Sequence, residues 1–253
     1  MSGRVLITGA TSGIGLQLAL DYRRAGWQVW GCGRDGERLQ ALGLDGVTPL
    51  QFDARDLAAM SGVAATLPSL DLLILNAGNC EYMDVAEGFD SELFARVIET
   101  NLTATGHALA AFLPLLGAGS RLAIVSSSVS WLPLPRAEAY GASKAALDYL
   151  ADTLRLDLAS KGIGVTLIRP GFVQTPLTAK NDFPMPCLVT VEQASRAIMG
   201  SSHCCRGSRR RRGPHRRRSS RRGRISHCRR SPRRGRGACC CRSSRCGRRS
   251  HCC

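Results

Sequence analysis

A doubly wound α/β fold, with helices on both faces of a parallel β-sheet, is predicted for residues 1–199. Short apolar runs alternate with longer amphipathic runs along this part of the chain, which gives six β-then-α units in order. One run, LDLLIL, is apolar at all but one position, as is typical of a strand buried on both faces of a parallel sheet. Right-handed crossovers would join these units into one sheet.

The first half of the chain predicts four strands. RVLIT, at residues 4–8, has the length and the β-branched residues of a strand, and the helix after it repeats Ile14, Leu18 and Tyr22 at four-residue intervals before ending at Gly26. The other elements expected here are strands at residues 27–32, 48–52 and 70–75 and helices at residues 35–42 and 54–67.

The second half continues the alternation. A long helical region is expected from about Ser91 to Leu116, and a second long helix from about Glu138 to Ser160. Strands are expected at residues 121–127 and 164–169, and the run TVEQASRAIM begins a further helix at residues 190–199.

The charge divides the 253-residue chain in two. Residues 1–199 hold 15 Lys and Arg and all 19 Asp and Glu, whereas residues 200–253 hold 20 Arg and no acidic residue. The formal net charge of +16 therefore arises entirely in the last part, which excludes a nucleic-acid-binding function for the first 199 residues. We expect one domain at residues 1–199 and a low-complexity basic tail at residues 200–253.

Cysteine usage and hydropathy indicate the compartment. Only Cys32, Cys80 and Cys187 lie in the first 199 residues, which is too few and too scattered for a disulfide framework. No apolar run approaches the roughly 20 residues of a membrane span, and the N-terminal residues do not resemble a signal peptide. We expect a cytoplasmic protein without a membrane partner.

A glycine-rich turn, TGATSGIG, joins the first strand to the first helix. Backbone N–H groups at a helix N-terminus can approach a pyrophosphate there, because glycine has no Cβ in the way. This placement predicts a Rossmann-like dinucleotide site, although a tight turn alone would also account for the glycines. The second strand ends in Gly33 and Arg34, with no acid before Asp35. Since a guanidinium suits the 2′-phosphate of NADP, we expect NADP(H) to be preferred over NAD(H); a solvated strand-end Arg34 is the alternative.

The predicted helix after the fifth strand carries Tyr140 and Lys144 four residues apart, and hence on one face. The strand before it ends in Val125-Ser126-Ser127, at the edge where ligands bind in open α/β sheets. A tyrosine has an ordinary pKa of about 10, so acid–base work near neutrality requires a lower value. The positive charge of Lys144 is expected to supply that lowering.

Together these motifs resemble the short-chain dehydrogenase/reductase family over essentially all of residues 1–199. The matches are TGATSGIG, Asn76-Ala77-Gly78 after the fourth strand, the Tyr140 and Lys144 pair, and Pro170-Gly171 with Thr175 after the sixth strand. The resemblance implies an oxidoreductase with these cofactor-binding residues: Gly9, Thr11, Ser12, Gly13, Ile14, Gly15, Arg34, Asp53, Asn76, Ala77, Gly78, Tyr140, Lys144, Pro170, Gly171, Val173 and Thr175. Asp53 would bond the adenine, although it could instead cap the following helix.

The resemblance also implies catalytic roles. Tyr140 would be the general acid for carbonyl reduction and the base for alcohol oxidation, and Lys144 would bind the nicotinamide ribose. Ser127 would bond the substrate oxygen, with Ser128 as the second choice among neighbouring serines. Asn101 would hold a water that leads to the lysine, unless it is a surface or N-cap residue. No metal site is expected.

The substrate is expected to be a small carbonyl or alcohol compound. Residues 131–135 beside the predicted catalytic serine, together with Phe172, Phe183 and Met185, suggest an apolar pocket, although they could equally pack as core or lid. The family implies a homodimer or homotetramer built with a C-terminal region that this sequence lacks. A catalytically compromised cofactor-binding remnant is therefore an alternative.

Residues 200–253 contain no Leu, Val, Phe, Tyr or Trp, so they cannot bury a core and are expected to be disordered. Three explanations compete: an out-of-frame translation of GC-rich DNA, which we favour, nucleic-acid binding through arginine, and metal binding through cysteine and histidine. The tail has no C-x-x-C pair, which weighs against a zinc site. Translating the coding DNA around codon 200 in the other frames tests the first explanation.

Overall fold

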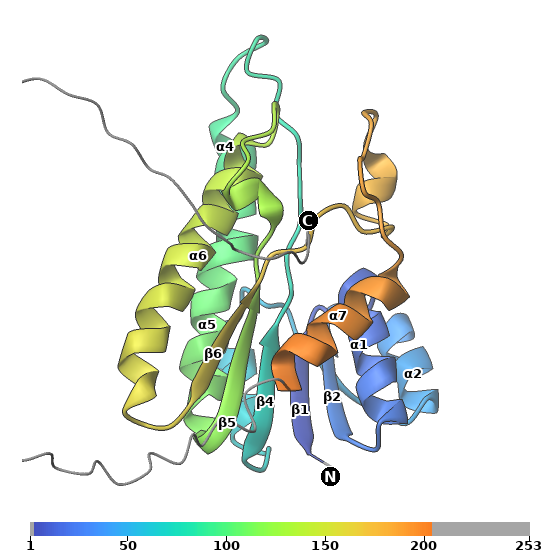
Figure 1. Ribbon diagram of the computed structural model, residues 1–253, viewed down its shortest axis with the longest axis vertical. Coiled ribbons are helices and arrows are strands. Elements are labelled where there is room, and N and C mark those ends of the chain that lie inside the picture. The colour runs from blue at the N-terminus through green and yellow to red at the C-terminus, as the bar shows by residue number, and fades with distance from the viewer. Residues whose placement is uncertain (1–2, 204–253) are drawn as a thin grey trace, which may run out of the picture. The chain divides into compact units, whose positions relative to one another are not determined.

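Six parallel strands form one sheet in the spatial order β3-β2-β1-β4-β5-β6. The structure is a computed structural model that describes residues 3–203 (Figure 1). The strands are β1 (Arg4–Thr8), β2 (Gln28–Gly33), β3 (Thr48–Gln51), β4 (Leu70–Leu75), β5 (Leu116–Val125) and β6 (Gly164–Ile168). The strand order reverses between β1 and β4, as in dinucleotide-binding sheets, and the predicted Rossmann-like fold is confirmed.

Helices cover both faces of the sheet (Figure 1). One face carries α1 (Gly13–Arg24), α2 (Gly36–Leu44) and α7 (Val191–His203). The other carries α3 (Leu57–Ala64), α5 (Ala104–Phe112) and α6 (Glu138–Ala159), with α4 (Ser91–Ile98) packed against α6. The helices begin where the sequence supplies capping acids: Asp35, Asp56 and Asp90 each accept a bond from a backbone N–H in the first turn of α2, α3 and α4.

Each face of the sheet has its own hydrophobic cluster, and the central strands contribute to both because they are apolar on both sides. In β4, Leu73 and Leu75 pack into the cluster beneath α3, α5 and α6, whereas Leu72 and Ile74 pack into the cluster beneath α1. This confirms the double burial predicted from the LDLLIL run. The one polar position, Asp71, lies at the start of the strand and accepts a hydrogen bond from the backbone N–H of Arg4 at 2.8 Å.

The long helix expected over residues 91–116 is interrupted twice. A five-residue π-helical segment, η1 (Glu99–Thr103), separates α4 from α5, and a 3₁₀ turn, η2 (Leu113–Leu115), follows α5. Leu116 already belongs to β5 and pairs with Leu70, five residues before the predicted start of that strand. A shift in register between Leu70 and Leu72 accommodates the extra residues, so β5 is longer than its apolar run.

The last described element is α7, whose helical turns continue past residue 199 to His203. Ser195 anchors it to α1 by donating a 2.7 Å hydrogen bond to Asp21 Oδ2, and Ile198 packs in the core beneath α1. From residue 204 onward, the predicted basic tail lies outside the described residues. No helix in residues 3–203 combines the length and apolar character that crossing a bilayer requires.

Candidate active site

A groove of about 470 Å³ lies at the carboxyl ends of the strands. These strand ends point toward the top of Figure 1. It is centred on the switch point between β1 and β4, where open α/β sheets bind their ligands. Eleven predicted cofactor-binding residues line it: Gly9, Thr11, Ser12, Gly13, Ile14, Arg34, Asp53, Asn76, Ala77, Gly78 and Thr175. The groove therefore brings together segments that lie up to 166 residues apart, from the first turn to the loop after β6.

The glycine-rich turn packs too closely for side chains. Gly9 has a φ of +67°, and a Cβ there would lie 2.9 Å from the Cα of Ala77. A Cβ on Gly15 would lie 2.2 Å from the carbonyl oxygen of Gly9. Within the described residues, the side chain of Ser12 makes no capping bond to α1, and Ser12, Gly13 and Ile14 at the start of this helix line the groove. The turn thus has the geometry that an anionic pyrophosphate requires.

The end of β4 is tied to this turn by paired hydrogen bonds. Thr8 Oγ1 accepts from the backbone N–H groups of Asn76 and Ala77 at 3.0 and 3.1 Å. Asn76 Nδ2 donates back to the carbonyl oxygens of Thr8 and Gly9 at 3.2 and 3.3 Å. Thr8 was not among the predicted site residues, although it lines the groove. Thr8 ends the first predicted strand, and this position directly before the glycine-rich turn could have indicated that it belongs to the site.

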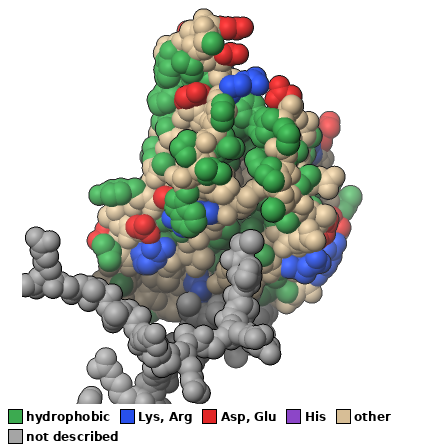
Figure 2. Space-filling view, turned by 45° about the horizontal axis from the view of Figure 1, so that its top comes forward, with side chains coloured by type: hydrophobic (Ala, Val, Ile, Leu, Met, Phe, Trp, Pro, Cys, Tyr) green, Lys and Arg blue, Asp and Glu red, His purple; other side chains and the backbone are tan. Residues whose placement is uncertain are grey.

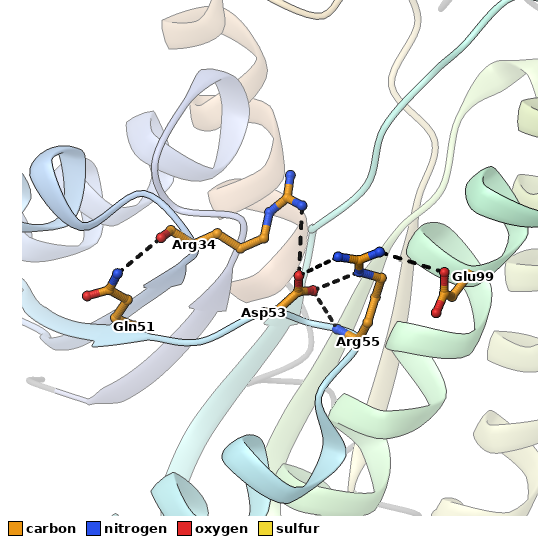
Figure 3. A network of polar contacts seen from close by, with 5 residues as sticks. All are labelled: Arg34, Gln51, Asp53, Arg55 and Glu99. Atoms are coloured by element: carbon orange, nitrogen blue, oxygen red, sulfur yellow. Dashed lines mark hydrogen bonds and ion pairs between the residues drawn. The ribbon is translucent and has the colours of Figure 1, made fainter. Parts of the chain in front are cut away.

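At the end of the groove that lies after β2 and β3, two arginines flank one carboxylate (Figure 3). Arg34 Nη1 lies 3.9 Å from Asp53 Oδ2, and Arg55 Nη2 lies 2.7 Å from the same oxygen. The hydrogen bonds from Arg55 lower the pKa of Asp53 to about 2. The alternative role of Asp53 as a helix cap is wrong, because Asp56 caps α3 by accepting from the N–H of Ala59. Arg55 was missed by the sequence analysis.

Tyr140 and Lys144 lie one turn apart on α6, with the Lys144 ammonium 5.7 Å from the centre of the tyrosine ring. Burial raises the pKa of Tyr140 to about 12, and its hydrogen bond with the Ser127 side chain opposes that rise. Burial also lowers the pKa of Lys144 to about 8, while Nζ donates a 3.0 Å bond to the carbonyl oxygen of Val125. The prediction that the charge of Lys144 lowers the pKa of Tyr140 is therefore wrong for this structure, because burial raises that pKa and the group that opposes the rise is Ser127.

Asn101 reaches the same site from the π-helical segment. It is fully buried, accepts from the backbone N–H of Asn79 at 2.8 Å, and donates to the carbonyl oxygen of Asn79 and to Ser143 Oγ at 2.9 and 3.0 Å. A Cβ on Gly78 would lie 3.0 Å from Asn101 Oδ1 and 3.4 Å from Lys144 Nζ. Asn101 is thus neither a surface residue nor a helix cap.

The remaining predicted residues lie beside the groove. Ser128 is exposed and donates its backbone N–H to the carbonyl oxygen of Pro170 at 2.9 Å. Val173 is buried and bridges to Val189. These predicted residues are not among the described residues that line the groove: Gly15, Asn101, Ser127, Tyr140, Lys144, Pro170, Gly171 and Val173. Asn101 and Lys144 adjoin the groove at Gly78, where an added Cβ would lie 3.0 Å from Asn101 Oδ1 and 3.4 Å from Lys144 Nζ.

The loops that follow β4, β5 and β6 meet beside Tyr140. Tyr82 packs edge-on against Phe183 with ring centres 5.8 Å apart, and Phe183 packs against Phe172 at 6.1 Å. Tyr82 Oη also donates a 2.6 Å bond to Asn181 Oδ1, which joins two of the loops. Tyr82 was not predicted. The aromatic cluster supplies apolar surface on these loops.

Large hydrophobic side chains are exposed on the same loops: Val85, Phe89, Trp131, Leu132, Leu177 and Leu188. Figure 2, in which the top of the molecule comes forward, shows hydrophobic side chains gathered over the upper part of this face, with charged side chains scattered among them. Trp131 is 71% exposed and covers the guanidinium of Arg169 at 4.1 Å. In residues 3–203, no group of three or more His, Cys, Asp or Glu side chains could hold a metal ion.

Comparison with known proteins identifies relatives of this chain by sequence. The sequence pattern of the family described as short chain dehydrogenase matches residues 4–184. An uncharacterized oxidoreductase of Myxococcus xanthus is 38% identical over 201 residues, covering 75% of this chain and 79% of the relative. A serine 3-dehydrogenase of Rhizobium radiobacter is 36% identical, covering 70% of this chain and 75% of the relative.

A solved structure gives a similar result. The closed form of a serine dehydrogenase complexed with NADP⁺ superposes with a TM-score of 0.70 at 29% sequence identity. The match covers 79% of this chain and 89% of that one. The fold similarity therefore extends over most of both chains.

Proposed function

The chain belongs to the short-chain dehydrogenase family, and from this premise we propose that it transfers a hydride between NADP(H) and a small carbonyl or alcohol substrate. The observation that carries the proposal is the convergence of Tyr140, Ser127, Lys144 and Asn101 beside a groove built on a glycine-rich turn. Any one of these motifs could occur without the others, so the proposal depends on finding them together.

The groove supports the binding of a dinucleotide. The turn between β1 and α1 would take the pyrophosphate, since the residues at the start of this helix line the groove beside closely packed glycines. Arg34 would take the 2′-phosphate, and Asp53 would face the adenine. Lys144 would hold the nicotinamide ribose, and Thr175, which lies against Gly13, would face the carboxamide. When bound, the nicotinamide supplies or accepts the hydride.

Tyr140 would move the proton that accompanies the hydride. Its raised pKa keeps the phenol protonated at neutral pH, so it can donate to a carbonyl oxygen during reduction. Ser127 would bond the same substrate oxygen and stabilise the charge that develops on it. Lys144 has a pKa of about 8 and is mostly charged at neutral pH, so it can oppose the cost of forming a phenolate during oxidation.

The substrate side favours an apolar or aromatic compound. Tyr82, Phe172 and Phe183 form a connected aromatic cluster on the loops beside Tyr140. The nearby cation Arg136 is engaged with Asp182 at 3.3 Å and lies over the Tyr82 ring. These contacts support a substrate held by apolar surface rather than by a charged group.

The test is NADPH oxidation with a panel of aliphatic and aromatic aldehydes and ketones. We expect Tyr140→Phe to reduce kcat at least 100-fold, because the proton donor is lost, while the Kd for NADPH stays within threefold. Tyr149→Phe, on an exposed position of the same helix, is the matched control and should retain full activity. Tight NADPH binding without turnover on any substrate would instead favour a cofactor-binding remnant.

The same assay separates the two candidate serines. Ser127→Ala should lower kcat by about 10²–10³, the usual effect of removing one donor to a developing oxyanion. Ser128→Ala should change kcat less than threefold, because this side chain is exposed and Ser127 is the residue bonded to Tyr140. The opposite ranking would move the catalytic role to Ser128.

A further inference from the structure

An acid lies beside the cation that the proposed function assigns to the 2′-phosphate. Asp53 Oδ2 is 3.9 Å from Arg34 Nη1, although 71% of the Arg34 side chain is exposed toward solvent. A carboxylate at this distance both attracts the guanidinium and repels a phosphate dianion. The carboxylate also stays ionised at any working pH, because its pKa is about 2. Its charge must therefore be offset by a neighbouring cation.

Arg55 provides that cation through three hydrogen bonds. Its backbone N–H and its Nε donate to Asp53 Oδ1 at 2.9 and 3.1 Å, and its Nη2 donates to Oδ2 at 2.7 Å. A carboxylate has about four acceptor positions, so Arg55 occupies three of them and leaves one on Oδ2. This bidentate pairing is much closer than the 3.9 Å contact to Arg34.

Each arginine also contacts a residue other than Asp53, Arg55 through its side chain and Arg34 through its backbone carbonyl (Figure 3). Arg55 Nη1 lies 3.8 Å from Glu99, the first residue of η1. Gln51 Nε2 donates a 3.2 Å bond to the backbone carbonyl of Arg34 and fixes the strand end that carries it. The guanidinium of Arg34 is thus left with only the longer contact to Asp53 among the ion pairs of the described residues.

We propose that Arg55 is a positioning residue for cofactor selection: it holds the Asp53 carboxylate and so leaves Arg34 available to the 2′-phosphate of NADP(H). The inference rests on the proposed function, because it assumes that a nicotinamide dinucleotide occupies this groove. NAD(H) has no phosphate at this position. The adenine that Asp53 would face is common to both nucleotides, so the ratio of their two affinities depends on Arg55 through the phosphate.

The experiment measures the Kd of NADPH and of NADH for the full-length chain by nucleotide fluorescence. Arg55→Gln should raise the Kd of NADPH at least tenfold and change the Kd of NADH less than twofold. The matched control is Arg38→Gln, because Arg38 is also an exposed arginine paired with an aspartate, Asp35, at 3.1 Å. It should leave both constants unchanged.

Rescue distinguishes positioning from a structural role. Adding Asp53→Asn to Arg55→Gln should restore most of the NADPH affinity, because the unpaired carboxylate is then gone. Arg55→Lys, which keeps the charge but not the bidentate geometry, should fall between the wild-type protein and Arg55→Gln. An unchanged ratio of the two constants in Arg55→Gln, or an absence of rescue, overturns the inference while leaving the proposed function intact. A wild-type chain that binds neither nucleotide overturns both.

Discussion

Burial acts on Tyr140 and Lys144 in opposite directions, although both side chains belong to one face of α6. Removing a group from water disfavours its charged form, which raises the pKa of a phenol and lowers that of an amine. The two pKa values therefore move to about 12 and about 8. The lysine keeps most of its charge at neutral pH, and the carbonyl oxygen of Val125 and the acidic groups of Cys80 and Asp148 favour that charge.

The cost of burying Lys144 should appear as a pH-dependent stability difference. Below pH 8 the amine is charged in both the folded and unfolded states, so the folded protein bears the full cost of burial. Above its unfolded pKa of about 10.4 it is neutral in both states, so the cost vanishes. The shift corresponds to about 3 kcal/mol, and Lys144→Met removes this titration.

Urea denaturation of Lys144→Met and of the wild-type protein at pH 7 and pH 9.5 measures this effect. The free energy of unfolding of the variant, relative to wild type, should fall by about 2 kcal/mol between the two pH values. Titrating groups that do not interact with Lys144, such as the buried Cys32, cancel in the difference. Cys80 does not cancel, because Lys144 lowers its pKa, and the higher pKa of Cys80 in the variant acts in the same direction as the loss of Lys144. Lys161→Met, at an exposed lysine, is the control. Its free energy of unfolding relative to wild type should be the same at pH 7 and at pH 9.5. A pH-independent difference for Lys144→Met would contradict the argument.

At the scale of secondary-structure elements, the π-helical segment η1 determines the position of one buried side chain, that of Asn101. Its five residues interrupt the α-helical run between α4 and α5, and Asn101 uses both ends of its amide to bond Asn79 and Ser143. Asparagine in a helix interior is otherwise unfavourable. The local distortion is therefore compensated by bonds that connect α6 with the loop after β4, and π-bulges often lie at functional sites in this way.

Replacing Asn101 should destabilise this junction. Asn101→Leu keeps the volume but leaves the N–H and carbonyl groups of Asn79 without their partners, at a cost of about 3 kcal/mol in the free energy of unfolding. Thr105→Val is the matched control, because it removes a single buried bond to the carbonyl oxygen of Asn101 and should cost about 1 kcal/mol. Urea denaturation followed by circular dichroism measures both. Equal losses for the two variants would show that the amide bonds contribute little.

Sequence periodicity predicted the elements whose order follows from hydrophobic pattern, but not those set by contacts between distant segments. The strand at residues 70–75 and the Tyr140 and Lys144 pair were recognisable because their spacing is local. The early start of β5 at Leu116 was not, since it depends on pairing with Leu70. The link between Arg55 and Asp53 spans only two residues, yet the role we propose for it depends on Arg34, which follows another strand.

At the scale of the whole molecule, the charge separates two parts of the sequence. Residues 1–199 carry more acidic than basic residues, 19 against 15, whereas residues 200–253 carry 20 arginines and no acid. The residues that line the groove belong to the first part. The described ion pairs among them join Arg34, Arg55 and Arg96 to acidic residues of the same part. Nucleotide binding and any binding of polyanions should therefore depend on different residues.

A chain ending at His203 tests that separation. The full chain should bind duplex DNA with an affinity that falls about 10³-fold or more between 50 and 200 mM salt, as expected when many arginines displace counterions from phosphates. The chain ending at His203 should lose this binding and keep the same Kd for NADPH, and fluorescence anisotropy with a labelled duplex measures the first property. Equal DNA affinity for both chains would place the interaction in the first part.

DNA binding by the full chain would not decide where its arginines come from. Arginine side chains release counterions from a polyanion whether selection or a shifted reading frame placed them there, so the salt dependence is the same in either case. The discriminating result is a change in NADPH-dependent turnover when DNA is added. A genuine DNA-regulated enzyme should show such a change, whereas an out-of-frame tail should leave kcat within twofold, because it has no selected contact with the catalytic residues.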